Sequence, residues 1–203
     1  MKTLWADPSA ERWAEVLRSY SSVVEAQGVR RLPELDQWYR NELPAILASR
    51  KVAYVTLDEL VRITEWKMAR GVWRQRNLVL VRGNAPEAVQ RVSTEAFAAV
   101  PDRTAPVKLL STLAGVGPAT ASAVVAAHHP VVYPFFDELV AAQIPQAEAV
   151  TFNLRYYAWY AGQLRGRAEK LGDDWTPARV EQALWANSGG KAAILGVPEE
   201  MSS

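Results

Sequence analysis

The sequence predicts an all-α protein, on three observations. Apolar residues recur at helical spacing along most of the chain, and helix start and stop signals bound these stretches. About half of the 203 residues are hydrophobic (49%), which is enough to bury a sizeable core. Only three short runs, Lys51 to Val55, Leu78 to Val81 and Val131 to Tyr133, are candidate strands. No internal repeat is present, so we expect residues 1–203 to form a single helical unit.

The N-terminal part predicts two helices. Asp7 and Pro8 are a favourable N-cap and first helical residue, and apolar residues then recur at helical spacing to about Ala26. A second helix is predicted from Glu34 to Ser49. Pro44 lies inside it and should kink or divide it, because proline lacks the backbone donor that a helix interior needs.

Two further helices follow in the middle of the chain. Thr56 and Glu59 form a capping-box pattern that opens a third helix, and Gly71 is its predicted stop signal. The segment from Asn84 starts another helix that should run to about Ala99.

The C-terminal half predicts three more helical stretches outside the central motif. One begins at Pro106 and reaches Leu113, a long aromatic-rich one covers Val150 to Leu171, and Thr176 with Pro177 opens a last one that should end near Ser188.

Composition excludes several classes of protein. The chain has no cysteine, which rules out disulfides, thiolate zinc sites and an iron–sulfur cluster. Basic residues (23) and acidic residues (22) nearly cancel, so any basic surface must be local. The N-terminus lacks a signal-peptide core and no run approaches a membrane span. We therefore expect a soluble nuclear or cytoplasmic protein that is not secreted and has no membrane partner; its oligomeric state is not predicted.

A Gly-x-Gly turn at Gly115-Val116-Gly117 joins two helical patterns. Glycine there allows a positive φ and a close approach of a ligand, and the free amides that follow form an anion site at a helix start. The small residues after Pro118 let the second helix pack closely. A lone Gly-x-Gly is also typical of an ordinary tight turn, and that alternative stays open.

The flanking residues are more specific. The run Leu113-x-Gly-Val-Gly-Pro-x-Thr-Ala121 resembles the helix-hairpin-helix of the HhH-GPD DNA glycosylase superfamily, and Asp137 follows at the spacing which that family shows. The resemblance covers about Leu109 to Val140. It implies a two-lobed helical fold with the hairpin at about 106–128 and with the helices of both chain ends as candidates for a second lobe. The segments Leu35 to Tyr39 and Glu65 to Gly71 are similar to those of uncharacterised eukaryotic glycosylase-like proteins.

The resemblance implies a role for the hairpin backbone. The amides of Gly115, Gly117 and Ala119 would bind a phosphate of double-stranded DNA, which positions the duplex without reading its sequence. The carbonyls of three further residues would hold a monovalent cation, K⁺ or Na⁺, and these are Ser111, Leu113 and Val116.

The resemblance also places Asp137 beside the sugar of an extruded nucleotide, where a carboxylate stabilises positive charge or activates water during cleavage of the N-glycosidic bond. The alternative is that Asp137 caps the helix that begins near Glu138. Bifunctional family members carry a nucleophilic lysine where this chain has Ala119, so the resemblance predicts at most a monofunctional glycosylase. Glu138 is unusual after the aspartate and would repel phosphate.

A basic segment with interleaved tryptophans runs from Arg62 to Arg82. It predicts a DNA-backbone surface that includes Arg70, Arg74 and Arg76, with Lys67 as a candidate general acid or substrate clamp. A solvated helical face is the alternative. The candidate base-pocket residues are Trp38, Tyr39, Trp66 and Tyr157, for which core packing is the alternative.

The sequence therefore leaves three functions open. The first is a monofunctional base-excision DNA glycosylase with Asp137 at the sugar. The second is a DNA-binding protein that keeps this fold without the chemistry, and the third is a helical protein-interaction module whose hairpin only packs.

Overall fold

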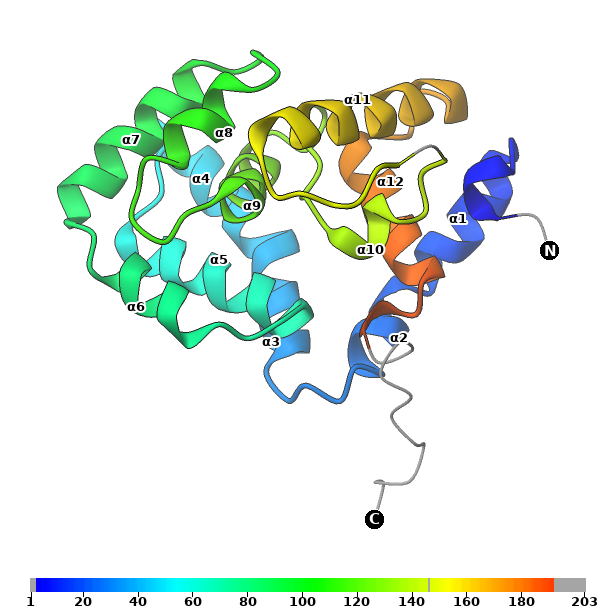
Figure 1. Ribbon diagram of the computed structural model, residues 1–203, viewed down its shortest axis with the longest axis horizontal. Helices are drawn as coiled ribbons and strands as arrows, with labels where there is room; N and C mark the ends of the chain where they lie inside the picture. Colours follow the sequence, from blue (N-terminus) through cyan, green and yellow to red (C-terminus); the bar gives the residue numbers. More distant parts are fainter. Residues whose placement is uncertain (1–2, 146, 192–203) are drawn as a thin grey trace.

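The computed structural model describes residues 3–145 and 147–191, and within these ranges every regular element is helical (Figure 1). The all-α prediction is confirmed. In chain order the elements are the 3₁₀ turn η1 (Leu4–Ala6), α1 (Ala10–Arg18), α2 (Tyr20–Glu25), α3 (Leu32–Gln37), the π-helical turn η2 (Trp38–Glu42), α4 (Leu43–Ser49), α5 (Leu57–Arg70), α6 (Gln75–Arg82), α7 (Pro86–Ala98), α8 (Ala105–Leu110), α9 (Pro118–His128), α10 (Glu138–Ala141), α11 (Leu154–Leu171) and α12 (Pro177–Asn187).

None of the three candidate strands is a strand. The run Leu78 to Val81 lies in α6, where Leu78 and Val81 are buried and the two residues between them are exposed. This three-residue spacing fits one face of a helix rather than the alternation of a strand. The other two runs, 51–55 and 131–133, are bends, turns or extended chain.

The first predicted helix is divided and begins later than expected. Ser9, rather than Asp7, is the N-cap of α1, because its hydroxyl accepts the amide of Arg12. At Ser19 the backbone amide bonds to the carbonyl of Val16, three residues back, and this tight closure ends α1 before α2 begins.

Pro44 divides the second predicted helix, as the sequence indicated. The chain passes from α3 through η2 into α4, and the amide of Leu43 bonds to the carbonyl of Trp38, five residues back. A π-helical turn absorbs one extra residue at the place where proline cannot donate. The capping box of α5 is also confirmed, since Thr56 and Glu59 each accept the other's backbone amide.

Helix α9 lies at the centre of the molecule (Figure 1). All of its residues from Ala119 to Ala127 are buried, and it packs against α4, α5, α7 and α8. On the other side α12 packs against α1, α2, α10 and α11, so helices from both ends of the chain meet. Among residues 3–145 and 147–191, every helix falls short of the length or the apolar character that a bilayer crossing demands.

Helices α8 and α9 form the predicted hairpin. Gly115 in its turn has φ +74° and faces α6, where an added Cβ would stand 2.7 Å from the carbonyl oxygen of Asn77. The Asn84 side chain braces the turn, because its amide oxygen accepts the amide of Ala114 and its amide nitrogen donates to the Ala114 carbonyl. The turn is therefore fixed to α6 and to the residues that follow it.

Candidate pocket at the start of the second hairpin helix

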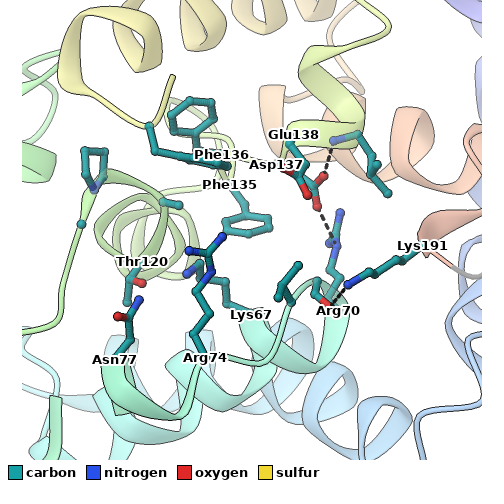
Figure 2. Close-up of a pocket in the computed structure, with 17 residues that line it drawn as sticks. Lys67, Arg70, Arg74, Asn77, Thr120, Phe135, Phe136, Asp137, Glu138 and Lys191 are labelled. Carbon is teal, nitrogen blue, oxygen red and sulfur yellow. Dashed lines mark hydrogen bonds and ion pairs between the residues drawn. The ribbon is translucent and has the colours of Figure 1, made fainter. Parts of the chain in front are cut away.

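A pocket of about 320 Å³ opens where the start of α9 meets the end of α5 (Figure 2). Its walls come from the end of α5, the loop into α6, the first turn of α9, the segment that leads into α10, and two later residues. The residues that line it are Lys67, Arg70, Gly71, Val72, Arg74, Asn77, Gly117, Pro118, Ala119, Thr120, Phe135, Phe136, Asp137, Glu138, Leu139, Phe152 and Lys191.

The start of α9 presents unpaired backbone amides to this pocket. Gly117 is the N-cap, and no side chain caps the helix. Among the described residues, the amides of Ala119 and Thr120 have no hydrogen-bond acceptor. Of the three residues whose backbone amides were predicted to bind phosphate, Gly117 and Ala119 line the pocket, whereas Gly115 does not and packs toward α6.

Asp137 lies on the opposite wall of the pocket and is only 9% exposed. Its Oδ1 atom accepts the amide of Leu139 at 2.8 Å, so it caps α10 as the structural alternative expected. Its Oδ2 atom lies 3.3 Å from Nε of Arg70. Both carboxylate oxygens therefore have partners within the protein.

The position of Arg70 argues against the predicted contact with DNA phosphate. Its side chain is buried, with the residue only 2% exposed, and it forms an ion pair with Glu181 as well as with Asp137. It also donates to the hydroxyl of Tyr20. Arg70 lies on the buried face of α5. The run of basic residues in the sequence did not show which of them face the core.

Arg70 belongs to a buried ionic network behind the pocket. The fully buried Glu181 accepts from both Arg70 and Arg40, and Arg40 also lies 3.9 Å from Asp36. Burial raises the pKa of Glu181, while Arg70 and Arg40 oppose that shift. Tyr20 donates to Asp36, and burial raises the pKa of Tyr20. The network neutralises its own charges and fixes one side of Asp137.

Lys67 is the amine in the pocket that lacks a protein partner. It is half-buried and makes no hydrogen bond or ion pair with any residue in the described ranges. Burial lowers its pKa, and the positive charge of Arg74 lowers it further, while Glu138 acts in the opposite direction. Figure 2 shows Lys67 and Arg74 between Thr120 of α9 and Arg70 of α5.

The other cations differ in position. Arg74 is exposed and lines the pocket, whereas Arg76 is exposed on α6 and does not line it. Lys191 lines the pocket and donates to the carbonyl of Gly71 at 3.0 Å. The sequence analysis missed Lys191, because nothing in the spacing after the last predicted helix connects it with residues 120 positions earlier.

The four aromatic residues predicted to form a base pocket lie elsewhere. Trp38, Tyr39, Trp66 and Tyr157 are buried in the core and do not line the pocket. Tyr39 stacks on Trp66 with ring centroids 3.6 Å apart, so the core-packing alternative is the correct one.

Three phenylalanines supply the aromatic walls instead, and these are Phe135, Phe136 and Phe152. Phe135 and Phe136 precede Asp137 directly, so their position next to the candidate aspartate was a usable signal.

The hairpin carbonyls that were predicted to hold a monovalent cation are not shown to form a cation site. The carbonyl of Leu113 accepts the amide of Val116 at 3.1 Å, so one of the three expected ligand oxygens already has a partner. The contribution of Ser111 and Val116 stays a prediction. Within residues 3–145 and 147–191, no group of histidine, aspartate and glutamate side chains has the arrangement of a metal site.

No protein-family model matches this chain, and no curated protein or solved structure matches it. The candidate site therefore rests on its own geometry and chemistry.

Proposed function

We propose that this protein binds double-stranded DNA in the manner of a helix-hairpin-helix DNA glycosylase and takes one extruded nucleotide into the pocket. One observation carries the proposal: the unpaired amides at the start of α9 open onto the same pocket as Asp137. The proposal includes the two-lobed fold of that superfamily, in which α1 and α12, which pack together, belong to one lobe.

The phosphate contact would use backbone and side-chain donors together. The amides of Ala119 and Thr120 are available at the positive end of α9, where an anion is stabilised. Arg74 and Lys67 add positive charge on the facing wall. These contacts would hold the backbone of any duplex, because phosphates carry no sequence information.

The pocket suits a nucleobase in size and in lining. A volume of about 320 Å³ is within the range of small-molecule sites. Phe135 and the exposed Phe152 line it, and base–aromatic stacking is a common way to hold an extruded base.

The chemistry proposed for the site is hydrolysis of an N-glycosidic bond with Asp137 facing the sugar. A carboxylate there would stabilise the developing positive charge without forming a covalent bond. Ala119 stands where bifunctional enzymes have lysine, so the hairpin supplies no nucleophile for strand cleavage.

One observation favours a second function, a DNA-binding or protein-interaction module that keeps the fold without hydrolysis. Both oxygens of Asp137 are engaged, one by Leu139 and one by Arg70. An aspartate held in this way serves as a helix cap and network anchor whether or not it acts on a sugar.

Binding is tested by fluorescence anisotropy with a labelled duplex over a range of salt concentrations. We expect binding to weaken with salt, and Arg74→Ala to weaken it further and to lower the salt slope by about one ion. Arg91→Ala is the matched control, because Arg91 is exposed on α7 and does not line the pocket. Gly117→Val should also weaken binding, since its extended backbone accepts valine while the new side chain stands at the phosphate site. Affinity that ignores salt and both substitutions would contradict the proposal.

Hydrolysis is tested by measuring base release from a panel of damaged and mismatched duplexes. The expected result is release that is lost in Asp137→Asn while duplex affinity is retained. A protein that binds the duplexes and releases no base would instead establish the module without chemistry.

A further inference from the structure

The amine of Lys67 lines the pocket, and the proposed phosphate contacts do not account for its lack of a protein partner. Three charged side chains of the pocket have protein partners. Arg70 and Asp137 pair with each other, and Lys191 donates to the carbonyl of Gly71. Lys67 has no such partner in the part of the chain that the structure describes. Partial burial removes some of the hydration of the charged amine, and no ion pair within the described residues compensates for that loss.

The surroundings of Lys67 disfavour the charged amine relative to a lysine in water. Burial lowers its pKa, and Arg74 lowers it further. The exposed carboxylate of Glu138, which follows Asp137 at the start of α10, raises it. A lysine whose pKa is lowered by an apolar setting and a neighbouring cation is the arrangement that activates an amine toward carbonyl carbon.

We propose that Lys67 is a nucleophilic amine that forms a reversible imine with an aldehyde carried next to a phosphate group. The guanidinium of Arg74 and the free amides of Ala119 and Thr120 would bind the phosphate, and the amine would face the carbonyl. The wall formed by Phe135 excludes water from one side of the bond. This role differs from that of a general acid, and it requires no lysine in the hairpin.

The reaction balances without an oxidant or a further reactant. The nitrogen lone pair of Lys67 forms a bond to the aldehyde carbon, and the carbonyl oxygen takes a proton to give a carbinolamine. The C–O bond then breaks, the oxygen leaves as water, and nitrogen loses its remaining proton as the C=N bond forms. Glu138 can relay the proton, because its charge acts on Lys67 and its side chain is exposed to solvent. Hydrolysis by water reverses each step.

An aldehyde beside a phosphate has two sources, a free sugar phosphate or the opened sugar of an abasic position in DNA. The DNA source rests on the proposed function, and the free source does not. The amine chemistry can therefore be tested separately from duplex binding.

The experiment traps imines with borohydride on the full-length protein and maps them by peptide mass spectrometry. The carbonyl compounds are glyceraldehyde 3-phosphate, unphosphorylated glyceraldehyde and a duplex with one abasic position. We expect Lys67 to be labelled several-fold faster by the phosphorylated aldehyde than the exposed lysines Lys51, Lys108 and Lys170. Glyceraldehyde should lose this preference. Labelling by the abasic duplex in addition identifies DNA as a source, and labelling by the free compound alone identifies the sugar phosphate.

Variants make the test specific. Lys67→Arg keeps the charge and should lose the adduct, whereas Lys170→Arg should keep it. Arg74→Gln should slow labelling and move its pH profile upward. Glu138→Gln should quicken labelling and move the profile downward, because the two side chains act on the Lys67 pKa in opposite directions.

Labelling of Lys67 at the rate of the exposed lysines, from both sources, overturns the inference even where anisotropy shows that the duplex is bound. An absence of duplex binding together with fast labelling by the free aldehyde overturns only the proposed function.

Discussion

Arg70 and Arg74 are four residues apart in the sequence and line the same pocket, yet only the charge of Arg70 is paired within the described residues. Arg70 is buried against Glu181 and Asp137, inside a network that the protein neutralises for itself. Arg74 is exposed and has no side-chain partner among the described residues, and Lys67 beside it is likewise unpaired. A charge that the protein does not neutralise is available to a ligand. The buried network therefore supports the fold, and the pocket cations are the candidates for binding.

The largest effect should come from removing the centre of the buried network. Glu181→Ala would leave Arg40 and Arg70 buried without their common carboxylate. Breaking a buried ion pair in this way costs about 3–5 kcal/mol of unfolding free energy. Urea denaturation measures the loss, and Glu181→Gln provides a milder variant that folds more readily.

The matched change on the pocket side is Glu138→Ala. This carboxylate is exposed and makes no ion pair within the described ranges, so we expect a change of less than about 0.5 kcal/mol. Equal losses from the two substitutions would remove the distinction between network and pocket.

The next largest difference in stability should separate alanine substitutions at the two hairpin glycines. Gly115→Ala places a methyl group 2.7 Å from the Asn77 carbonyl oxygen at φ +74°, which should cost about 2–4 kcal/mol through strain and overpacking. Gly117→Ala meets no atom within 4 Å and should leave stability within about 0.5 kcal/mol. Thermal denaturation checks both. A destabilised Gly117→Ala would contradict the open space that the structure shows beside this residue.

The smallest effect concerns Lys67 and pH. Because the folded state lowers its pKa, the unfolded chain binds more protons between that lowered pKa and the usual lysine value of 10.5, and stability rises with pH in that window. Lys67→Met should therefore be more stable than the parent protein near neutral pH, and the difference should shrink as pH approaches 10.5. Urea titrations of both proteins at several pH values measure it. A difference that stays constant with pH would mean that burial does not disfavour the charged amine.

Much of the fold could be predicted from the sequence, because capping and helix-stop signals are local. Thr56 with Glu59 and Thr176 with Pro177 mark helix starts that the structure confirms. The break at Ser19 could not be predicted, since the preceding and following segments both have helical periodicity. Leu78 to Val81 was ambiguous because a run of four apolar residues fits a buried strand as well as a helix.

The site was less predictable because it depends on which face of a helix a residue occupies. The motif located the turn, and the structure brings Gly117 and Asp137 to one pocket. The sequence could not show that Arg70 turns inward while Arg74 turns outward, since both belong to one basic run. Nor could it show that Trp66 stacks in the core, because an aromatic residue beside cations fits both a core and a binding surface.

The position of Glu181 has a consequence for synthesis of the chain. Arg40 and Arg70 leave the ribosome long before α12, and α12 carries the carboxylate that neutralises them. A nascent chain that ends before Thr176 would have to bury two guanidinium groups without that partner, which is unfavourable. The N-terminal helices should therefore stay loosely packed during translation and reach their final arrangement only after α12 has emerged.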